Sequence, residues 1–431
     1  MSDLVITNGT VVDAAGTRRI DLRVANGVVA EAGEQLDGDT VLDADGLIVA
    51  PGFVDLQASL GEPGDEEAET IQSGSRSAAL GGYTAVVAAP TTDPIVDSAA
   101  VVGQIHSLAH DSLCEVLPSA AITQGLEGGA LTPMAELVRC GVRIFTDGSQ
   151  AVQDARMMRT ALDYAGGLSH LADGVSVVLA SHCDVESLSA GASMHEGEWS
   201  SRLGIPGSPA EAEELMISRD IALARLTGGR LHIRHVTTAR GVDEIRRAKS
   251  EGLAITAEAT PHHLCLDHSI CAGFDSSAKF TPPLRPVEDV AAVRVGLLDG
   301  TLDAIVTDHA PHTRQEAERP FLDAPAGSVG LETAFAVANT ELGADIEKLV
   351  ELLSINPARI AGIEDRHGGP IEVGRAANLV LLDLDVEWTV RGAALASRSA
   401  NTPFEGRTLR GNVRHTIWNG EHVVNMGEAT R

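Results

Sequence analysis

Short β-branched runs separated by Asn-Gly and Asp-Gly turns fill the first fifty residues. They read LVITNGTVVD (4–13), RRIDLRVANGVVAEAG (18–33) and TVLDADGLIVAPG (40–52). Alternating apolar and polar residues bounded by such turns indicate β-hairpins. The same pattern returns near the end, in GGPIEVGRAANLVLLDLD (368–385) and TLRGNVRHTIWNGEHVV (408–424). We therefore predict one small β unit that both termini build together.

Between these ends, apolar strand runs alternate with helical stretches. TAVVAAP (84–90) and LHIRHV (231–236) are examples of the runs, and EAEELMISRDIALARLT (211–227) is one of the helices. Repeated alternation predicts a parallel sheet with helices outside it. Several runs end in His or Asp, as the active face of a (β/α)₈ barrel requires. The predicted fold is α/β, a (β/α)₈ TIM-like barrel (51–365) with a small β-sandwich domain formed from both termini (1–50 and 366–431).

Composition narrows the classes of function. The 431 residues carry 32 Lys and Arg against 61 Asp and Glu, a net charge of −29. Such acidity disfavours binding to nucleic acid or to an anionic membrane. No apolar run reaches the roughly 18 residues of a membrane span, and MSDLVITNGTVVD (1–13) does not resemble a signal peptide. Five scattered cysteines without CxxC spacing fit reduced thiols, so we expect a cytoplasmic protein.

Several motifs, in order along the chain, resemble the dihydroorotase branch of the amidohydrolase superfamily. The resemblance covers nearly the whole sequence and rests chiefly on PGFVDL (51–56), APTTDP (89–94), LHIRHVTTARGVDEI (231–245), TAEATPHHL (256–264), TDHAPH (307–312) and NTPFEGRTLRGNV (401–413). It implies a metal-dependent hydrolase of pyrimidine biosynthesis that interconverts dihydroorotate and N-carbamoyl-aspartate. A bound metal would lower the pKa of the attacking water and polarise the cyclic amide.

The resemblance also implies a ligand set, which this chain keeps only in part. The family's His-x-His after the first barrel strand is replaced by Gln57 and Ser59, which bind zinc far more weakly than imidazole. His182, His235 and Asp308 match retained metal positions, and Asp308 would also transfer the proton. Asp147 is one acid where relatives carry two. We expect at most a weak mononuclear zinc site from these four residues, and no two-metal centre.

Substrate contacts implied by the family are reduced as well. The arginine that would grip the substrate carboxylate falls at Gly61, and two asparagines fall at Thr91 and Thr281. His312 is a retained substrate-binding residue. Loss of metal ligands and substrate contacts together suggests a relaxed demand for the reaction.

Strand alternation makes a separate prediction about two neighbouring histidines. His235 is the residue that matches the family, and His232 lies three positions earlier, so alternation puts the two side chains on opposite sides. We therefore expect His232 to pack outside the barrel. His182 and His235 could equally be histidines satisfied by hydrogen bonds, and Asp308 could be structural.

Three hypotheses follow for the function. The first is a catalytically impaired, dihydroorotase-like protein that acts as a structural partner of aspartate transcarbamoylase, a role implied by noncatalytic relatives. The second is an active cyclic amide hydrolase with an atypical metal site. The third is a small-molecule binding module that uses the barrel mouth. Because the family is commonly oligomeric, we also expect a homo-oligomer.

Overall fold

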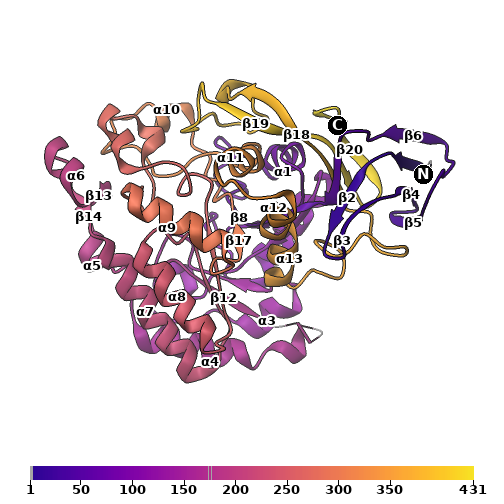
Figure 1. Ribbon diagram of the computed structural model, residues 1–431. Coiled ribbons are helices and arrows are strands. Elements are labelled where there is room, and N and C mark those ends of the chain that lie inside the picture. The colour runs from indigo at the N-terminus through magenta and orange to yellow at the C-terminus, as the bar shows by residue number, and fades with distance from the viewer. Residues whose placement is uncertain (1–2, 173, 176) are drawn as a thin grey trace.

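The computed structural model describes residues 3–172, 174–175 and 177–431. Its centre is a closed ring of eight parallel strands, with the small β domain at one side (Figure 1). The ring contains, in order, β8 (Phe53–Ala58), β9 (Tyr83–Ala88), β10 (Glu115–Pro118), β11 (Ile144–Phe145), β12 (Val178–Ser181), β15 (Leu231–Ile233), β16 (Ile255–Ala259) and β17 (Ala304–Ile305). The predicted barrel is confirmed.

Two isolated bridges close the ring between its two sheets. Ala120 pairs with Phe145 beyond the end of β10, and Ala58 pairs with His309 beyond the end of β17. Next to the second bridge, Asp55 accepts hydrogen bonds from Thr307 N (2.8 Å) and Thr307 Oγ1 (2.7 Å). Complete burial raises the pKa of Asp55 to about 8 despite these bonds. A buried carboxyl therefore fastens the first barrel strand to the last.

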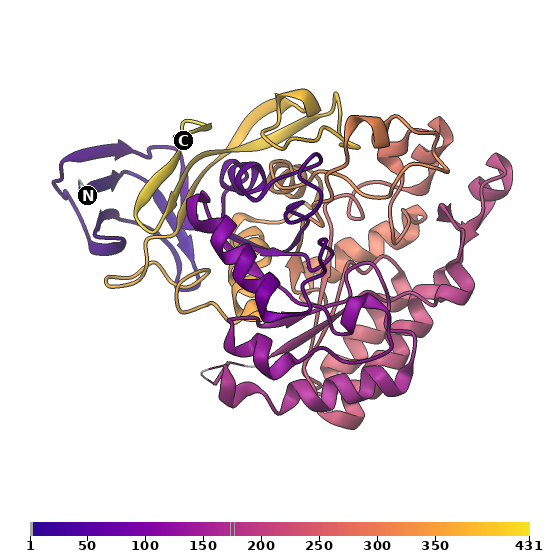
Figure 2. The same cartoon turned by 180° about the vertical axis from the view of Figure 1, so that it is seen from behind.

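Helices surround the ring, mostly in strand–helix alternation (Figure 2). They are α1 (Ile71–Leu80), α2 (Ala99–Leu108), α3 (Met134–Arg139), α4 (Ala155–Gly166), α7 (Ala210–Thr227), α8 (Ala239–Ser250), α9 (Val287–Leu298), α11 (Ala334–Glu341), α12 (Ile346–Val350) and α13 (Asn356–Ala361). Alternate strand residues such as Leu231 and Ile233 pack in the large aliphatic core with residues of these helices. Val178 and Ala304 belong to a second cluster that includes residues of α13. Among the described residues, no helix is long and apolar enough to cross a bilayer.

The terminal segments form a β-sandwich. One sheet has the order β5-β4-β1-β6, from Val28–Gly33, Asp21–Ala25, Leu4–Thr7 and Thr40–Asp43. The other has the order β21-β20-β19-β18-β7-β2-β3, from Glu428–Ala429, Glu421–Asn425, Thr408–Trp418, Leu379–Thr389, Ile48–Pro51, Thr10–Asp13 and Gly16–Arg19. Leu379 faces Pro51 in antiparallel register, so the two ends of the chain meet within one sheet. The predicted β-sandwich from both termini is confirmed.

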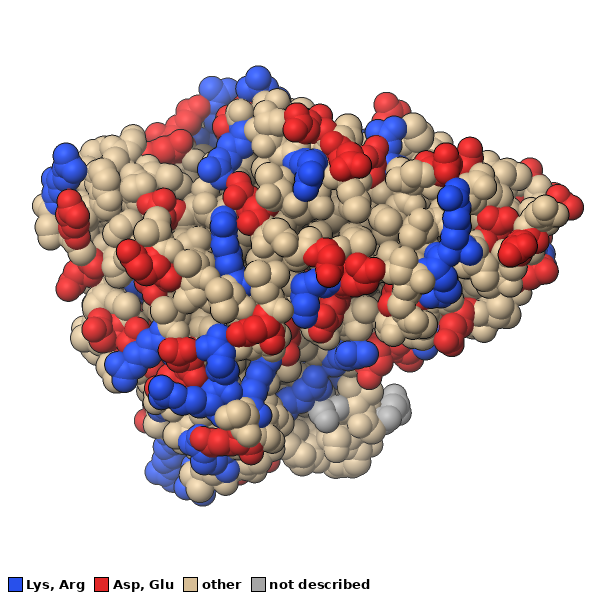
Figure 3. Space-filling model, viewed as in Figure 1, with Lys and Arg blue, Asp and Glu red and all other residues tan. Residues whose placement is uncertain are grey.

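Smaller elements lie outside these layers. Between β12 and α7 the chain forms α5 (Glu186–Ser189), β13 (Met194–His195), α6 (Glu198–Leu203) and β14 (Gly207–Ser208), which project from the barrel (Figure 1). The short α10 (Arg314–Ala317) follows β17. On the face drawn in Figure 3, Lys and Arg gather near α7 and α8, where Arg225 pairs with Glu251 and Arg246 pairs with Asp299.

Candidate functional site

A cavity of about 450 Å³ opens at the carboxyl ends of the barrel strands. Five residues singled out from the sequence line it, namely Gln57, Ser59, His235, Asp308 and His312. Thr91 and Thr281, at the positions of the family's asparagines, line it as well. The barrel thus gathers these side chains at its mouth, the face on which enzymes of this fold carry out their chemistry.

The end of β8 supplies no imidazole to this cavity. Gln57, the second-last residue of the strand, is buried. The Ser59 backbone N–H donates to the His309 carbonyl at 2.8 Å. Two residues on, Gly61 has φ +69°, and a Cβ there would lie 2.1 Å from the Glu69 carbonyl oxygen. The tight turn after β8 therefore excludes any side chain from the position where the family has its substrate-binding arginine.

Two buried histidines meet beneath the mouth. His182 Nδ1 lies 3.1 Å from His235 Nε2, with the rings edge to face. Burial, reinforced by the charge of Arg234, lowers the pKa of His182 to about 3 and that of His235 well below its usual range. Both rings are therefore neutral, and one nitrogen donates to the other. His235 Nδ1 has no hydrogen-bond partner among the described residues.

Asp147 does not join these histidines. Its Oδ1 accepts from the backbone N–H groups of Ile122 (2.7 Å) and Thr123 (2.9 Å), and its Oδ2 accepts from Thr123 Oγ1 (2.6 Å). Burial raises its pKa, while these bonds oppose the rise. Both oxygens hold the loop after β10, so the structure gives Asp147 a supporting contact in place of a ligand position.

Asp308 faces a residue that sequence reasoning missed. Arg234 Nη2 lies 3.3 Å from Asp308 Oδ1, and Arg234 Nη1 donates to the Gly148 carbonyl at 2.6 Å. Only 4% of the Arg234 side chain is exposed, against 23% for Asp308. The sequence did contain a signal for Arg234: it is a charged residue inside the apolar run LHIRHV, directly before His235. Buried charges need partners, so this arginine belongs to the site.

The residues at the mouth do not fit a catalytic zinc. Such sites use three protein ligands and one open position. Within residues 3–172, 174–175 and 177–431, no group of three or more His, Cys, Asp or Glu side chains is placed to hold a metal ion. Two histidines are available, but Asp147 is turned away and Asp308 is bound to a guanidinium.

His232 lies inside the barrel, so the prediction that it packs outside is wrong. Its Nε2 lies 2.7 Å from Glu258 Oε2 and its Nδ1 lies 2.8 Å from Thr256 Oγ1. Strand β15 ends at Ile233, and His235 follows with φ +35°. Alternation does not extend across this bend, which turns His232 and His235 toward the same interior.

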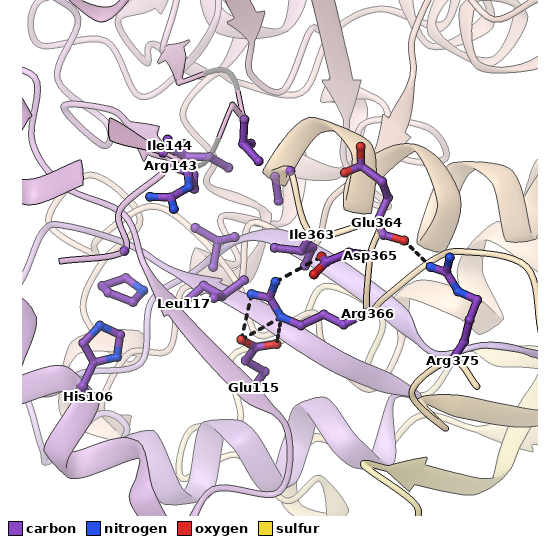
Figure 4. Close-up of a pocket in the computed structure, with 17 residues that line it drawn as sticks. His106, Glu115, Leu117, Arg143, Ile144, Ile363, Glu364, Asp365, Arg366 and Arg375 are labelled. Carbon is purple, nitrogen blue, oxygen red and sulfur yellow. Dashed lines mark hydrogen bonds and ion pairs between the residues drawn. The ribbon is translucent and has the colours of Figure 1, made fainter. Parts of the chain in front are cut away.

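A larger cavity, of about 690 Å³, lies at the opposite end of the strands (Figure 4). Two of its arginines have partners within the protein: Arg366 Nε donates to Glu115 Oε2 at 2.9 Å, and Arg375 donates to the backbone carbonyl of Glu364. His367 Nε2 lies 2.6 Å from Glu115 Oε2. This end of a barrel usually serves stability, and the ion pairs here fit that role.

An eight-stranded barrel with histidine and aspartate at its mouth, joined to a β-sandwich from both termini, defines a protein of the amidohydrolase class. The family model described as Dihydro-orotase-like matches residues 46–240. A dihydroorotase from Pelotomaculum thermopropionicum is 44% identical over 430 residues, 98% of each chain. One from Mycobacterium tuberculosis is 43% identical over 421 residues, 95% of this chain and 96% of that one. The chain belongs to the dihydroorotase branch of the amidohydrolase superfamily.

Solved structures agree on the fold. The L-hydantoinase (dihydropyrimidinase) from Arthrobacter aurescens superposes with a TM-score of 0.89 at 23% identity, covering 100% of this chain and 98% of that one. A dihydropyrimidinase from Brevibacillus agri gives a TM-score of 0.84. At this identity the likeness concerns architecture, so the activity has to be argued from the residues of the mouth.

Proposed function

We propose that this dihydroorotase-like protein does not hydrolyse dihydroorotate at an enzymatic rate and serves as a structural partner in pyrimidine biosynthesis. One observation carries the proposal: Asp308, which would transfer the proton, is bound by the Arg234 guanidinium. The positions nearby that would supply imidazole ligands hold Gln57 and Ser59. Ring opening near neutral pH needs an activated water and a polarised carbonyl, and these side chains are poorly suited to provide either.

The partner that we propose is aspartate transcarbamoylase, with this chain as a cytoplasmic homo-oligomer. Support comes from the family, in which noncatalytic relatives hold that enzyme in an assembly, and from the barrel and β-sandwich that this chain retains. A scaffold needs its outer helices and loops, whereas the mouth is free to lose its chemistry.

The alternative is an active cyclic amide hydrolase. Two observations favour it: the relatives at 41–44% identity are named dihydroorotase, and the mouth remains open with His235, Asp308 and His312 on its walls. A small-molecule binding role rests on the same open cavity.

An assay of ring opening and ring closure, with saturating Zn²⁺ or Mn²⁺, separates these proposals. We expect the wild-type rate to equal that of an Asp308→Ala variant, the matched background control. A rate of about 1 s⁻¹ or more that Asp308→Ala abolishes would establish the enzyme. Gel filtration of purified protein with and without aspartate transcarbamoylase tests the partner, and failure to co-elute would remove it. Binding of dihydroorotate without turnover would favour the third role.

A further inference from the structure

Arg234 lies at the centre of a buried charge cluster. Besides Asp308, it faces Glu258, whose Oε1 is 3.9 Å from Arg234 Nε, and that Nε has no hydrogen-bond partner among the described residues. Arg234 is 4% exposed and Glu258 is 1% exposed. A single permanent cation therefore lies between two carboxylates from two different barrel strands or strand ends.

The surroundings hold the guanidinium in one orientation. Nη1 donates to the Gly148 carbonyl, and Thr146 Oγ1 lies 3.5 Å from the same nitrogen. Both residues belong to the loop after β11, on the far side of the mouth from Asp308. The planar fork of an arginine binds a carbonyl with one arm and a carboxylate with the other at a fixed separation, whereas the donors of a lysine rotate about a single nitrogen.

We infer that Arg234 is the resident cation of this barrel mouth. It takes the place of a divalent metal as the counter-ion of Asp308, so the mouth folds and keeps its shape without any metal. Glu258, which also contacts His232 at 2.7 Å, lies 3.9 Å from the same guanidinium. One buried and one partly buried carboxylate without a cation would be unfavourable. The positive φ values of His235 (+35°) and Asp308 (+48°) mark the same place as strained backbone, which persists only where the surroundings hold it firmly.

This inference rests on the proposed lack of metal-dependent catalysis, but it makes its own prediction about stability. Thermal unfolding of the 431-residue protein should be unchanged by excess EDTA and by added Zn²⁺. Arg234→Met removes the cation and keeps a long apolar side chain. We expect it to lower the unfolding midpoint by about 3–5 °C and to gain a zinc-dependent rise, because the positive charge beside His235 and Asp308, which repels a divalent cation, is then gone.

Arg219→Met is the matched control. Arg219 is partly buried and, like Arg234, binds an aspartate, Asp220, at 2.7 Å, but it lies on α7 away from the mouth cavity. Arg219→Met should lower the unfolding midpoint without gaining any response to zinc.

Asp308→Asn tests whether Arg234 and Asp308 are energetically coupled. The Arg234→Met/Asp308→Asn double variant should unfold at a higher temperature than Arg234→Met alone. Should Arg234→Met prove insoluble, a soluble double variant supports the inference and an insoluble one contradicts it.

The outcomes separate this inference from the proposed function. Stoichiometric metal in wild-type protein, or a midpoint that falls with EDTA, overturns the inference, and turnover in the same sample overturns the proposed function too. If Arg234→Met is as stable as wild type, shows no coupling to Asp308→Asn, or responds to zinc no more than Arg219→Met, Arg234 is not the resident cation. The absence of hydrolysis would then stand by itself.

Discussion

His182 Nδ1 and His235 Nε2 lie 3.1 Å apart beneath the barrel mouth, close enough for a hydrogen bond. Two nitrogens bound to one tetrahedral zinc would be separated by about 3.3 Å, so this pair alone does not distinguish a remnant of a metal site from a hydrogen-bonded pair of histidines. The neighbouring side chains distinguish these two possibilities. Gln57, Ser59 and the Arg234–Asp308 ion pair line the cavity beside His235, where further ligands would be needed.

Restoring the two missing histidines should not restore metal binding. The sequence alone leads to the expectation that Gln57→His with Ser59→His increases zinc affinity if the pocket is intact. Arg234 changes this expectation, since a fixed positive charge repels a divalent cation. Isothermal titration with zinc should show at most weak binding to the double variant. Adding Arg234→Met should increase its affinity at least about tenfold, equivalent to about 1.4 kcal/mol.

One result for the Gln57→His/Ser59→His variant would contradict the prediction of weak zinc binding. Stoichiometric zinc bound tightly while Arg234 is still present would mean that the guanidinium moves aside on binding. The Gln57→His/Arg234→Met variant, which lacks Ser59→His, serves as a control for the number of imidazoles that zinc binding requires.

Replacing Gly61 with arginine, the residue of the family at this position, should destabilise the fold. A Cβ at this position would lie 2.1 Å from the Glu69 carbonyl oxygen and 2.7 Å from that of Asp65. Gly61→Ala should lower the free energy of unfolding by about 3 kcal/mol or more, through strain and overpacking together. Gly128→Ala is the matched control, because Gly128 has the same φ of +69° with no heavy atom within 4 Å.

Urea unfolding of the two alanine variants measures the difference, and Gly61→Arg should be at least as unstable as Gly61→Ala. Equal losses at the two glycines would show that the turn after β8 adapts. Tighter binding of dihydroorotate by Gly61→Arg would show that the turn can still accommodate the family's arginine.

The fold could be predicted from the sequence because its signals are local and repeated. Asn-Gly turns such as that at Asn26 mark the sandwich hairpins, and strand runs such as 231–236 mark the barrel. The arrangement of the mouth depends on contacts between distant strand ends. No periodicity shows that Arg234 reaches Asp308, which lies 74 residues away.

Errors about the site arose where regular backbone ends. Alternation correctly describes β15 itself but not the bend after Ile233, so it misplaced His232. Gly61 could be recognised as a missing arginine, but the steric reason lies in the carbonyl of Glu69, which only the folded loop brings there. The partners of Asp147 likewise belong to a loop, at residues 24 and 25 positions earlier.

Asp147 should behave as a structural residue with or without metal. Asp147→Asn keeps the side-chain shape, but an amide cannot accept all the hydrogen bonds that the carboxylate accepts from Ile122 and Thr123. The free energy of unfolding should fall by about 1–3 kcal/mol, equally in EDTA and in saturating zinc. A loss of stability that appears only with zinc present would mean that Asp147 is a metal ligand.

Acid should weaken the ion pairs at the opposite end of the barrel. Burial raises the pKa of Glu115, but the hydrogen bonds from His367 and Arg366 lower it more, to about 2. A carboxyl whose pKa is depressed on folding stabilises the protein above its unfolded pKa, near 4.3, and loses that contribution as pH falls through the folded value. Glu115→Gln should therefore lose about 2–3 kcal/mol at pH 7, and its difference from wild type should shrink below about pH 4.5. Urea unfolding from pH 7 to pH 3 measures the trend, with the exposed Glu428→Gln as the control, and a difference that stayed constant across this range would rule out the ion pair as its cause.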